Sequence, residues 1–247
     1  MEKKIVATFN THKRRYGVRR IVVDLSNQNV FVSPFRVRRC LAVNGLKAIQ
    51  PRSFVPKTTN SRHPYLISPN HIKTRPFPKA INQVWVGDIT YIPMAAGKFR
   101  YLSVWMDLCS RKIVGWDLQD HMRESLVSAS LNKALKARKI SPGLMAHSDR
   151  GGQYAGNKFR QILESRKIIQ SMSDKDNPYD NAHMESFFSR FKAELLEKGA
   201  FKNAEDSRRQ IFEYIEMYYN PLRLHSSIGY LSPDKFEKQL ALTCNKN

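Results

Sequence analysis

The chain of 247 residues is poor in cysteine, in acidic residues and in long apolar stretches. Its three cysteines, Cys40, Cys109 and Cys244, form no CxxC pair, which argues against a disulfide framework and a cysteine zinc site. No apolar run approaches the roughly 20 residues that a membrane span needs, and no signal peptide precedes the first apolar segment. We therefore expect a cytoplasmic protein with reduced thiols and no membrane partner.

Acidic residues are scarcest at the start of the chain. The first 80 residues hold 17 Lys and Arg against 2 Asp and Glu, whereas residues 81–200 hold 18 against 13. This local excess of positive charge favours a polyanionic partner. Nucleic acid fits better than a membrane surface, because no basic amphipathic helix with a broad aromatic face accompanies the charge.

Residues 1–50 predict a small helix-turn-helix DNA-binding domain. An apolar stripe at helical spacing predicts a first helix that ends near Asn27 and carries Val18, Ile21, Val22 and Leu25. Ser33 before Pro34 is typical of a helix start, and Gly45 of its end, with an expected apolar face of Val37, Leu41 and Ala42. We expect the second helix to contact DNA through Arg36, Arg38 and Arg39. The alternative is a basic face that contacts only water.

Two further segments flank the central part of the chain. Residues 51–80 contain six prolines and predict an extended basic linker, in which His63 and His71 are ordinary histidines because no cysteine pair follows at ligand spacing. Residues 201–247 predict a helical appendage. Its main helix is expected to run from about Ala204 to Tyr219, to pack through Ile211, Phe212, Ile215 and Tyr218, and to lead into a polar loop with Arg223, His225 and Ser226.

Residues 81–200 predict an α/β catalytic core. Three strands rich in β-branched and aromatic residues come first, in VWVGDITYI, FRYLSVWMDL and KIVGWDL. A helix at about 123–138, a buried strand LMAHSD, a helix near 157–167, a strand IIQSM and a helix at about 182–198 follow. This order is that of the ribonuclease H-like fold, a mixed sheet of three antiparallel and two parallel strands flanked by helices.

Three carboxylates occupy distinct places in this predicted core. Asp88 lies in the middle of the central strand, Asp149 at the end of a strand and Glu185 in the first turn of a helix, with 60 and 35 residues between them. Such a set suits two divalent cations about 3.5–4 Å apart. The most serious rival is Asp107, which fits turn capping as well. Asp180 and Asn181 stand where caps of the last helix are expected.

Five longer motifs carry a family resemblance: NQVWVGDITYIP, YLSVWMDLCSRKIVGW, HSDRGGQYAG, NPYDNAHMESFFSRFKAEL and YYNPLRLHSSIGYLSP. Together they resemble the DDE transposases of bacterial insertion sequences, specifically the insertion sequence three family, whose cores are similar to retroviral integrases. The resemblance runs from about Tyr16 to the last dozen residues. It implies that Asp88, Asp149 and Glu185 are catalytic and bind two Mg²⁺ ions, for which Mn²⁺ substitutes, and that Lys192 contacts DNA.

The resemblance also marks residues around the second aspartate and the glutamate. It implies DNA contacts by Arg150, Tyr179 and Asn181, and supporting roles beside the metal ligands for His147 and Asn177. The alternative for each is a role in turn formation.

The implied function is cleavage of DNA at the ends of an insertion sequence followed by strand transfer into target DNA. The implied partners are double-stranded DNA at the terminal repeats and the target, further copies of the chain on DNA and a protein from an upstream reading frame. We accordingly expect association with the nucleoid. Two alternatives remain open: a ribonuclease H-like nuclease that only hydrolyses, and a non-catalytic DNA-binding regulator derived from a transposase.

Overall fold

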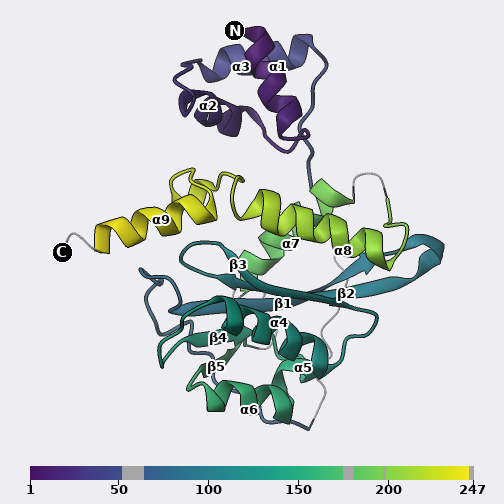
Figure 1. Cartoon of the computed structure of the whole chain (residues 1–247), viewed down its shortest axis with the longest axis vertical. Helices are drawn as coiled ribbons and strands as arrows, with labels where there is room; N and C mark the ends of the chain where they lie inside the picture. The colour runs from purple at the N-terminus through teal and green to yellow at the C-terminus, as the bar shows by residue number, and fades with distance from the viewer. Residues whose placement is uncertain (52–63, 175–180, 197–198, 245–247) are drawn as a thin grey trace.

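The molecule is built around a mixed sheet with helices on both faces (Figure 1). The computed structural model describes residues 1–51, 64–174, 181–196 and 199–244. In these residues the sheet has five strands in the order β3-β2-β1-β4-β5, namely β1 (Val84–Pro93), β2 (Phe99–Asp107), β3 (Ile113–Gln119), β4 (Met145–Ser148) and β5 (Ile169–Met172). β1–β2 and β2–β3 are antiparallel, whereas β1–β4 and β4–β5 are parallel. The predicted order of the strands along the chain and the mixed sheet of antiparallel and parallel strands are confirmed.

Alternating side chains bury the two faces of the sheet in separate cores. In β1, Val84 and Val86 enter one core and Trp85 enters the other. The core of Val84 and Val86 is covered by α7 (Ala182–Leu195), α8 (Ala204–Phe212) and η3 (Glu213–Tyr219). The core of Trp85 is covered by α4 (Glu124–Ala137), α5 (Gly152–Ala155) and α6 (Asn157–Ser165) (Figure 1).

The N-terminal domain lies beyond the α7–α8 layer, on the side away from the sheet (Figure 1). Within residues 1–51 its helices are α1 (Glu2–Thr11), α2 (Val18–Ser26) and α3 (Pro34–Val43). The predicted pair α2 and α3 is confirmed, and Ser33 Oγ accepts from the Arg36 amide as a helix cap should. The sequence did not predict α1, because its apolar face depends on only two large side chains, Ile5 and Phe9.

One side of α3 differs from the prediction. Ala42 is exposed, and Cys40 instead joins Val37 and Leu41 in the core of the domain. A cysteine three residues after Val37 occupies the same face of the helix and behaves there as a small apolar side chain. Arg36, Arg38 and Arg39 are exposed, as expected.

The described part of the predicted linker, residues 64–80, runs in extended form along β5. Ser68 Oγ donates to Gln170 Oε1 at 2.8 Å, and the His71 amide donates to Ser171 Oγ at 2.9 Å. The segment contains no helix or strand over 64–80, which agrees with the proline content. Besides acting as a linker, the segment covers β5 at the edge of the sheet. It thereby protects backbone groups of that strand that would otherwise be unpaired. His63 lies outside the described residues.

The C-terminal part continues α8 into a π-helical turn, η3. Ile211 and Ile215 are buried as predicted, but Phe212 is 49% exposed, and Tyr214 and Tyr219 are buried instead. The wider π turn, with bonds five residues apart, places Tyr214 and Tyr219 on one face. The regular period used for the prediction could not show this change of phase.

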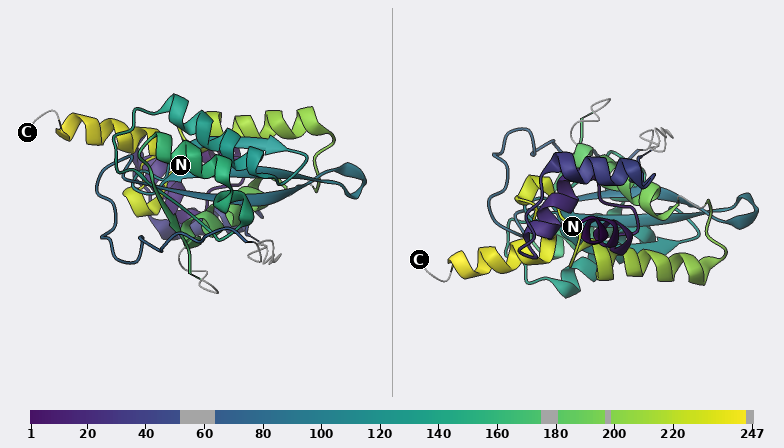
Figure 2. Two further views of the ribbon diagram at one scale, coloured as in Figure 1. Left: turned by 90° about the horizontal axis from the view of Figure 1, so that it is seen from below. Right: turned by 90° about the horizontal axis from the view of Figure 1, so that it is seen from above.

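The segment after η3 was predicted to be a polar loop, but part of it is buried. Arg223 is buried, at 3% exposure, and forms an ion pair of 2.7 Å with Glu194 of α7. The short helix η4 (Ser226–Ile228) follows, and α9 (Pro233–Cys244) then extends outward to the C-terminus (Figure 2). A single-turn helix η1 (Ala95–Gly97) joins β1 to β2. Within the described ranges, no helix is both long and apolar enough to cross a membrane.

We predict that Gly115→Ala destabilises the protein by about 1–3 kcal/mol, because an added methyl group would overpack the contact between β3 and α4. A Cβ atom at Gly115 would lie 2.5 Å from the Ser130 carbonyl oxygen and 2.7 Å from Ala134 Cβ. Urea unfolding measures the change. Gly17→Ser is the control, since nothing lies within 4 Å of a Cβ there and serine is favoured at a helix start. Equal stability of both variants would contradict the close packing.

Candidate active site

Asp88 and Asp149 lie on neighbouring strands and on the same face of the sheet. β1 pairs in parallel with β4 so that Val86 lies opposite His147. Two residues further along each chain come Asp88, still in β1, and Asp149, just beyond the end of β4. A step of two residues keeps the face. Both carboxylates therefore lie on the side of the sheet that α7 covers, as the predicted convergence requires.

The helix α7 carries Glu185 in its first turn and Lys192 two turns later. Its apolar face, with Phe187 and Phe191, packs against the sheet, while Glu185 is exposed and Lys192 is half-buried. Elements far apart in the sequence thus bring the third acid and the lysine to the face that holds the two aspartates.

Asn181 ties the start of α7 to the residue before Asp88. Its Nδ2 donates to the Gly87 carbonyl oxygen at 3.4 Å. Asn181 stands at the N-cap position, but its side chain makes no capping bond, so that part of the prediction is wrong. Its Oδ1 is buried and has no hydrogen-bond partner in the described part of the chain. The oxygen is an unsatisfied acceptor close to the backbone of Asp88.

The charges of the site act on one another. Burial raises the pKa of the Asp88 carboxyl well above its usual value, and the nearby charges of Asp149 and Glu185 raise it further. Burial lowers the pKa of Lys192, and the negative charge of Asp88 opposes this shift. The Lys192 ammonium therefore lies close enough to Asp88 for the two charges to act on each other.

The donor set has the chemistry of a site for hard cations. All three acids offer oxygen ligands, and crowded carboxylates with a raised pKa are stabilised by a cation between them. In the described residues, no three His, Cys, Asp or Glu side chains already converge as a metal cage. The residues therefore fit such an ion in the chemistry of their oxygen ligands.

His147, two residues before Asp149, anchors the end of β4 to β5. It is fully buried, with Nδ1 2.9 Å from Ser171 Oγ and Nε2 3.2 Å from Ser173 Oγ. Both ring nitrogens thus bind the end of β5, which connects the two strands near the site. This arrangement agrees with a supporting role rather than direct metal binding.

Arg150 also lies against the end of β5. Its Nε donates to the Ser173 carbonyl oxygen at 2.6 Å, and its Nη2 lies 3.5 Å from Asp174 Oδ1. Lys73 of the extended segment binds the same Asp174. The predicted DNA contact of Arg150 stays a prediction. The other two residues marked beside the glutamate, Asn177 and Tyr179, lie outside the described residues.

Gly151 allows the backbone to fold against Asp149. The Gly151 amide donates to Asp149 Oδ1 at 3.0 Å, and a Cβ atom at this glycine would lie 2.8 Å from Gln153 Oε1. The group that approaches this glycine in the structure is the carboxylate of Asp149.

Asp107, the rival acid, has a different role. It pairs in register with Trp85 and lies three positions after Val104, the partner of Asp88; because three is an odd step along a strand, it belongs to the opposite face. It is fully buried and accepts from the amides of Asn82 at 2.6 Å and of Cys109 and Ser110 at 3.0 Å each. The turn-capping interpretation is confirmed. The sequence did not predict that the Asn82 amide binds Asp107, because the positive φ of Asn82 cannot be recognised from an apolar pattern.

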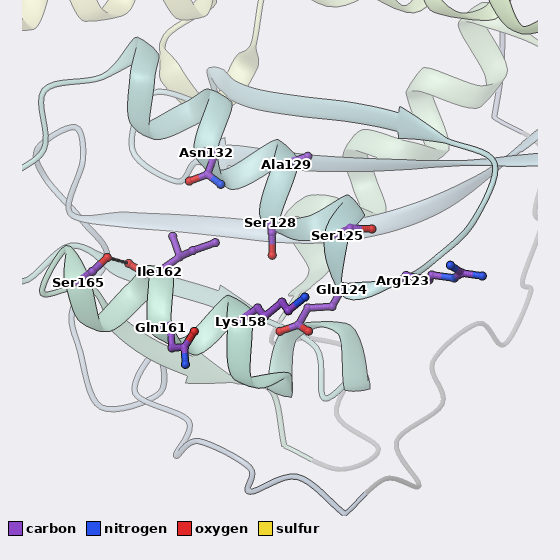
Figure 3. A pocket seen from close by; sticks show the side chains of 10 residues that line it. All are labelled: Arg123, Glu124, Ser125, Ser128, Ala129, Asn132, Lys158, Gln161, Ile162 and Ser165. Carbon is purple, nitrogen blue, oxygen red and sulfur yellow. Dashed lines mark hydrogen bonds between the residues drawn. The ribbon is translucent and has the colours of Figure 1, made fainter.

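A groove of about 800 Å³ lies between α4 and α6, on the other side of the sheet (Figure 3). Polar side chains from both helices line it, among them Ser128, Asn132, Lys158 and Gln161. None of Asp88, Asp149 and Glu185 is among its lining residues. The groove is therefore not the place where the three acids meet.

Comparison with known families identifies both parts of the chain. The profile described as "Integrase core domain" matches residues 78–178, and a second profile with this description matches residues 166–233. The profile described as "HTH-like domain" matches residues 1–54. These ranges correspond to the sheet with its helices and to the N-terminal helices.

Curated relatives match almost the whole chain. The transposase for insertion sequence element IS904 of Lactococcus lactis subsp. lactis (strain IL1403) is 40% identical over 238 residues, covering 96% of this chain and 93% of the relative. The transposase InsF for insertion sequence IS3A of Escherichia coli (strain K12) is 36% identical over 235 residues, covering 95% of this chain and 81% of the relative.

A solved structure shows the same fold. A chain of the simian T-cell lymphotropic virus intasome, in complex with the PP2A regulatory subunit B56 gamma, matches with a TM-score of 0.54 and 16% identity, over 87% of this chain and 70% of that chain. The ribonuclease H-like architecture of retroviral integrase cores is thereby confirmed. Enzymes of this kind bind DNA, act as oligomers and are polynucleotidyl transferases that use a divalent metal. By its relatives, its integrase core and its helix-turn-helix-like domain, the chain belongs to the IS3 family of insertion-sequence transposases.

Proposed function

We propose that Asp88, Asp149 and Glu185 are the catalytic carboxylates of this transposase and hold two Mg²⁺ ions, for which Mn²⁺ substitutes. One observation carries the proposal: the register of β1 and β4 sets the two aspartates level on the face covered by the helix of Glu185. The crowding of like charge at Asp88 supports it, because a carboxyl with a raised pKa gains most from a nearby cation.

In the proposed reaction, bound metal ions and side chains have different roles. Two divalent ions in such a site polarise the scissile phosphodiester and activate the attacking hydroxyl. Asp149 is oriented for its role by the Gly151 amide, which holds one carboxylate oxygen. Lys192, half-buried beside Asp88, is placed to hold a phosphate of the DNA end. Water serves as the nucleophile for cleavage and a DNA 3′-OH for joining, so the mechanism needs no covalent protein–DNA link.

DNA is proposed to contact the chain at two places. The exposed arginines of α3 in the N-terminal domain bind the phosphate backbone of DNA through their positive charge. Near the carboxylates, Arg150, Tyr179 and Asn181 are the proposed contacts. We further propose that copies of the chain assemble on DNA, and that an upstream-frame protein contributes to recognition of the terminal repeats.

A strand-transfer assay separates this function from its alternatives. The substrate is a duplex with a pre-cut end and a free 3′-OH, offered with Mg²⁺ and target DNA. The proposed transposase joins the end to the target. A nuclease would only hydrolyse the DNA, and a non-catalytic regulator would bind it unchanged.

We predict that Asp149→Asn and Glu185→Gln each lower joining of the pre-cut end by about a thousandfold or more, with little loss of DNA binding. Removing a ligand weakens stabilisation of the transition state and leaves phosphate contacts in place. Joining and gel-shift assays on the same preparations measure both. If either variant kept near wild-type joining, its carboxylate would not be catalytic.

We predict opposite stability changes for two other aspartates in metal-free buffer at pH 7. Asp88→Asn should stabilise the fold, because a carboxyl with a raised folded-state pKa opposes folding while it is charged. Burial raises the pKa of Asp107 as well, but both of its oxygens accept amide hydrogens. Asp107→Asn should therefore leave one donor unsatisfied and destabilise the fold by roughly 1–3 kcal/mol.

Urea unfolding of both variants measures these changes. Joining activity should be lost in Asp88→Asn, and Asp107→Asn should keep more of it. Destabilisation by Asp88→Asn would contradict the crowding of charge, and equal loss of joining would move Asp107 into the metal site.

We predict that replacing Arg36, Arg38 and Arg39 with alanine weakens duplex binding and flattens its dependence on salt. Each phosphate contact adds about 0.9 to the slope of log K against log salt, so three contacts would remove about 2.7. Fluorescence anisotropy over a series of salt concentrations measures the slope.

The control variant replaces Lys136, Lys158 and Arg166, which are exposed on α4, on α6 and just after α6 respectively. It removes the same three positive charges, but from the helices on the face of the sheet opposite α7. An equal fall of the slope in both variants would mean that net charge, rather than α3, determines binding.

A further inference from the structure

The N-terminal domain and the catalytic core meet where the start of α2 contacts the segment after η3. The Tyr16 hydroxyl donates to the Leu222 carbonyl oxygen at 3.2 Å and accepts from the Leu224 amide at 2.9 Å. One turn later, Arg20 Nε donates to the Leu224 carbonyl oxygen at 2.8 Å. We call these four residues the interdomain clasp. Because Tyr16 is fully buried and its hydroxyl acts as both donor and acceptor, the clasp joins the two backbones at one fixed position.

Side chains of the same segment complete the core of the N-terminal domain. Leu224 is 3% exposed and packs with Ile5, Phe9 and the other buried residues of that domain. Tyr218 packs against this core and also against the core between the sheet and α7. The Arg15 guanidinium lies 4.4 Å from the centre of the Tyr218 ring. The segment therefore belongs to both bodies.

Arg223, between the two clasp residues Leu222 and Leu224, connects in the other direction to α7. Its Nη2 lies 2.7 Å from Glu194 Oε1, and the Tyr214 hydroxyl donates to Glu194 Oε2 at 2.9 Å. Burial acts to lower the pKa of Arg223, but Tyr214 and Glu194 outweigh it, so the guanidinium stays charged. The pair is directional and hydrogen-bonded, which restricts α7 to one position relative to the clasp.

Glu194 and the catalytic residues lie on opposite sides of α7. Glu194 lies nine positions after Glu185, which at 3.6 residues per turn is two and a half turns. Accordingly Glu185 is exposed at the site, while Glu194 is buried toward the clasp. A helix of this length moves as one body, so the clasp and the site share a rigid element.

We infer that the clasp and the Glu194–Arg223 pair are positioning devices for transposition: they hold the DNA-binding face of α3 at a fixed place relative to Glu185 and Lys192. DNA bound by the N-terminal domain then reaches the carboxylates in one register. The inference rests on the proposed function in that both bodies engage DNA, but the coupling can be measured without catalysis.

The test compares Tyr16→Phe/Arg20→Ala with wild type. Phenylalanine keeps the buried ring, and both substitutions leave the proposed catalytic residues unchanged. Deuterium uptake is followed with and without a pre-cut duplex of about 30 base pairs, about 100 Å long. In wild type we expect the duplex to slow exchange in both α3 and α7. In the variant we expect faster exchange at residues 222–224 and at least a threefold smaller effect of the duplex on α7, with α3 still protected.

Joining rates supply the second readout. Wild type should join the long duplex at least tenfold faster than one of about 8 base pairs, about 27 Å long, because the short duplex offers far fewer phosphates to the N-terminal domain. The clasp variant should lose this preference and keep its rate on the short duplex. A general loss of folding would lower both rates together, and that result would overturn the inference.

Arg19→Ala is the matched control, because Arg19 is exposed on the same helix and carries the same charge as Arg20. It should keep the long-duplex preference and the protection of α7. Unchanged exchange at 222–224 in the clasp variant, or unchanged protection of α7, would overturn the inference. If wild type itself joins no DNA, the proposed function fails, and the exchange data still decide the coupling.

Discussion

The parallel pairing of β1 with β4 is the contact on which the rest of this molecule depends. β1 lies at the centre of the sheet, with β2 on one side and β4 on the other, so it sets the register of both halves. That register puts Asp88 level with Asp149. It also sends alternate side chains of β1 into different cores, which determines that α7 covers the face of the two aspartates and α4 the other. A slip of one residue would separate the acids and exchange the faces.

The helix α7 is the second element that several parts share. Phe187, Phe188 and Phe191 bury one side of it against the sheet, which fixes its axis. The remaining sides then carry charge in two directions, with Glu185 and Lys192 at the site and Glu194 toward the N-terminal domain. Removing one partner of a buried pair such as Glu194–Arg223 costs about 3–5 kcal/mol, because the other charge is left without compensation. The apolar contacts supply stability, and the ion pair supplies a specific position.

Some predictions failed, and each failure has a local cause. Phe212 was expected in the core, but it follows the buried Ile211 by one residue and so points away from the sheet, and in the π turn after it Tyr214 and Tyr219 are buried. Ala42 gave way to Cys40, since Cys40, three residues after Val37, lies on the buried face of the helix, whereas Ala42, five residues after it, does not. Arg223 was expected in a polar loop, because burial of an arginine depends on a partner, Glu194, that lies 29 residues away. The segment 64–80 was expected to be an extended linker and also covers β5, through hydrogen bonds to Gln170, Ser171 and Met172 that no composition reveals.

The sequence by itself determined the strands and the order of the elements in the core, and it predicted the three acids, because alternation, helical period and turn residues are local properties that short segments carry alone. It also determined that Asp107 suits a turn, since the residues that it caps follow it directly. Only the tertiary structure decided that Lys192 faces Asp88, that His147 binds β5 and that Tyr16 and Arg20 join the N-terminal domain to residues 222–224. These contacts join residues distant in the chain, and their hydrogen bonds and charges exist only once packing has excluded water and set the distances.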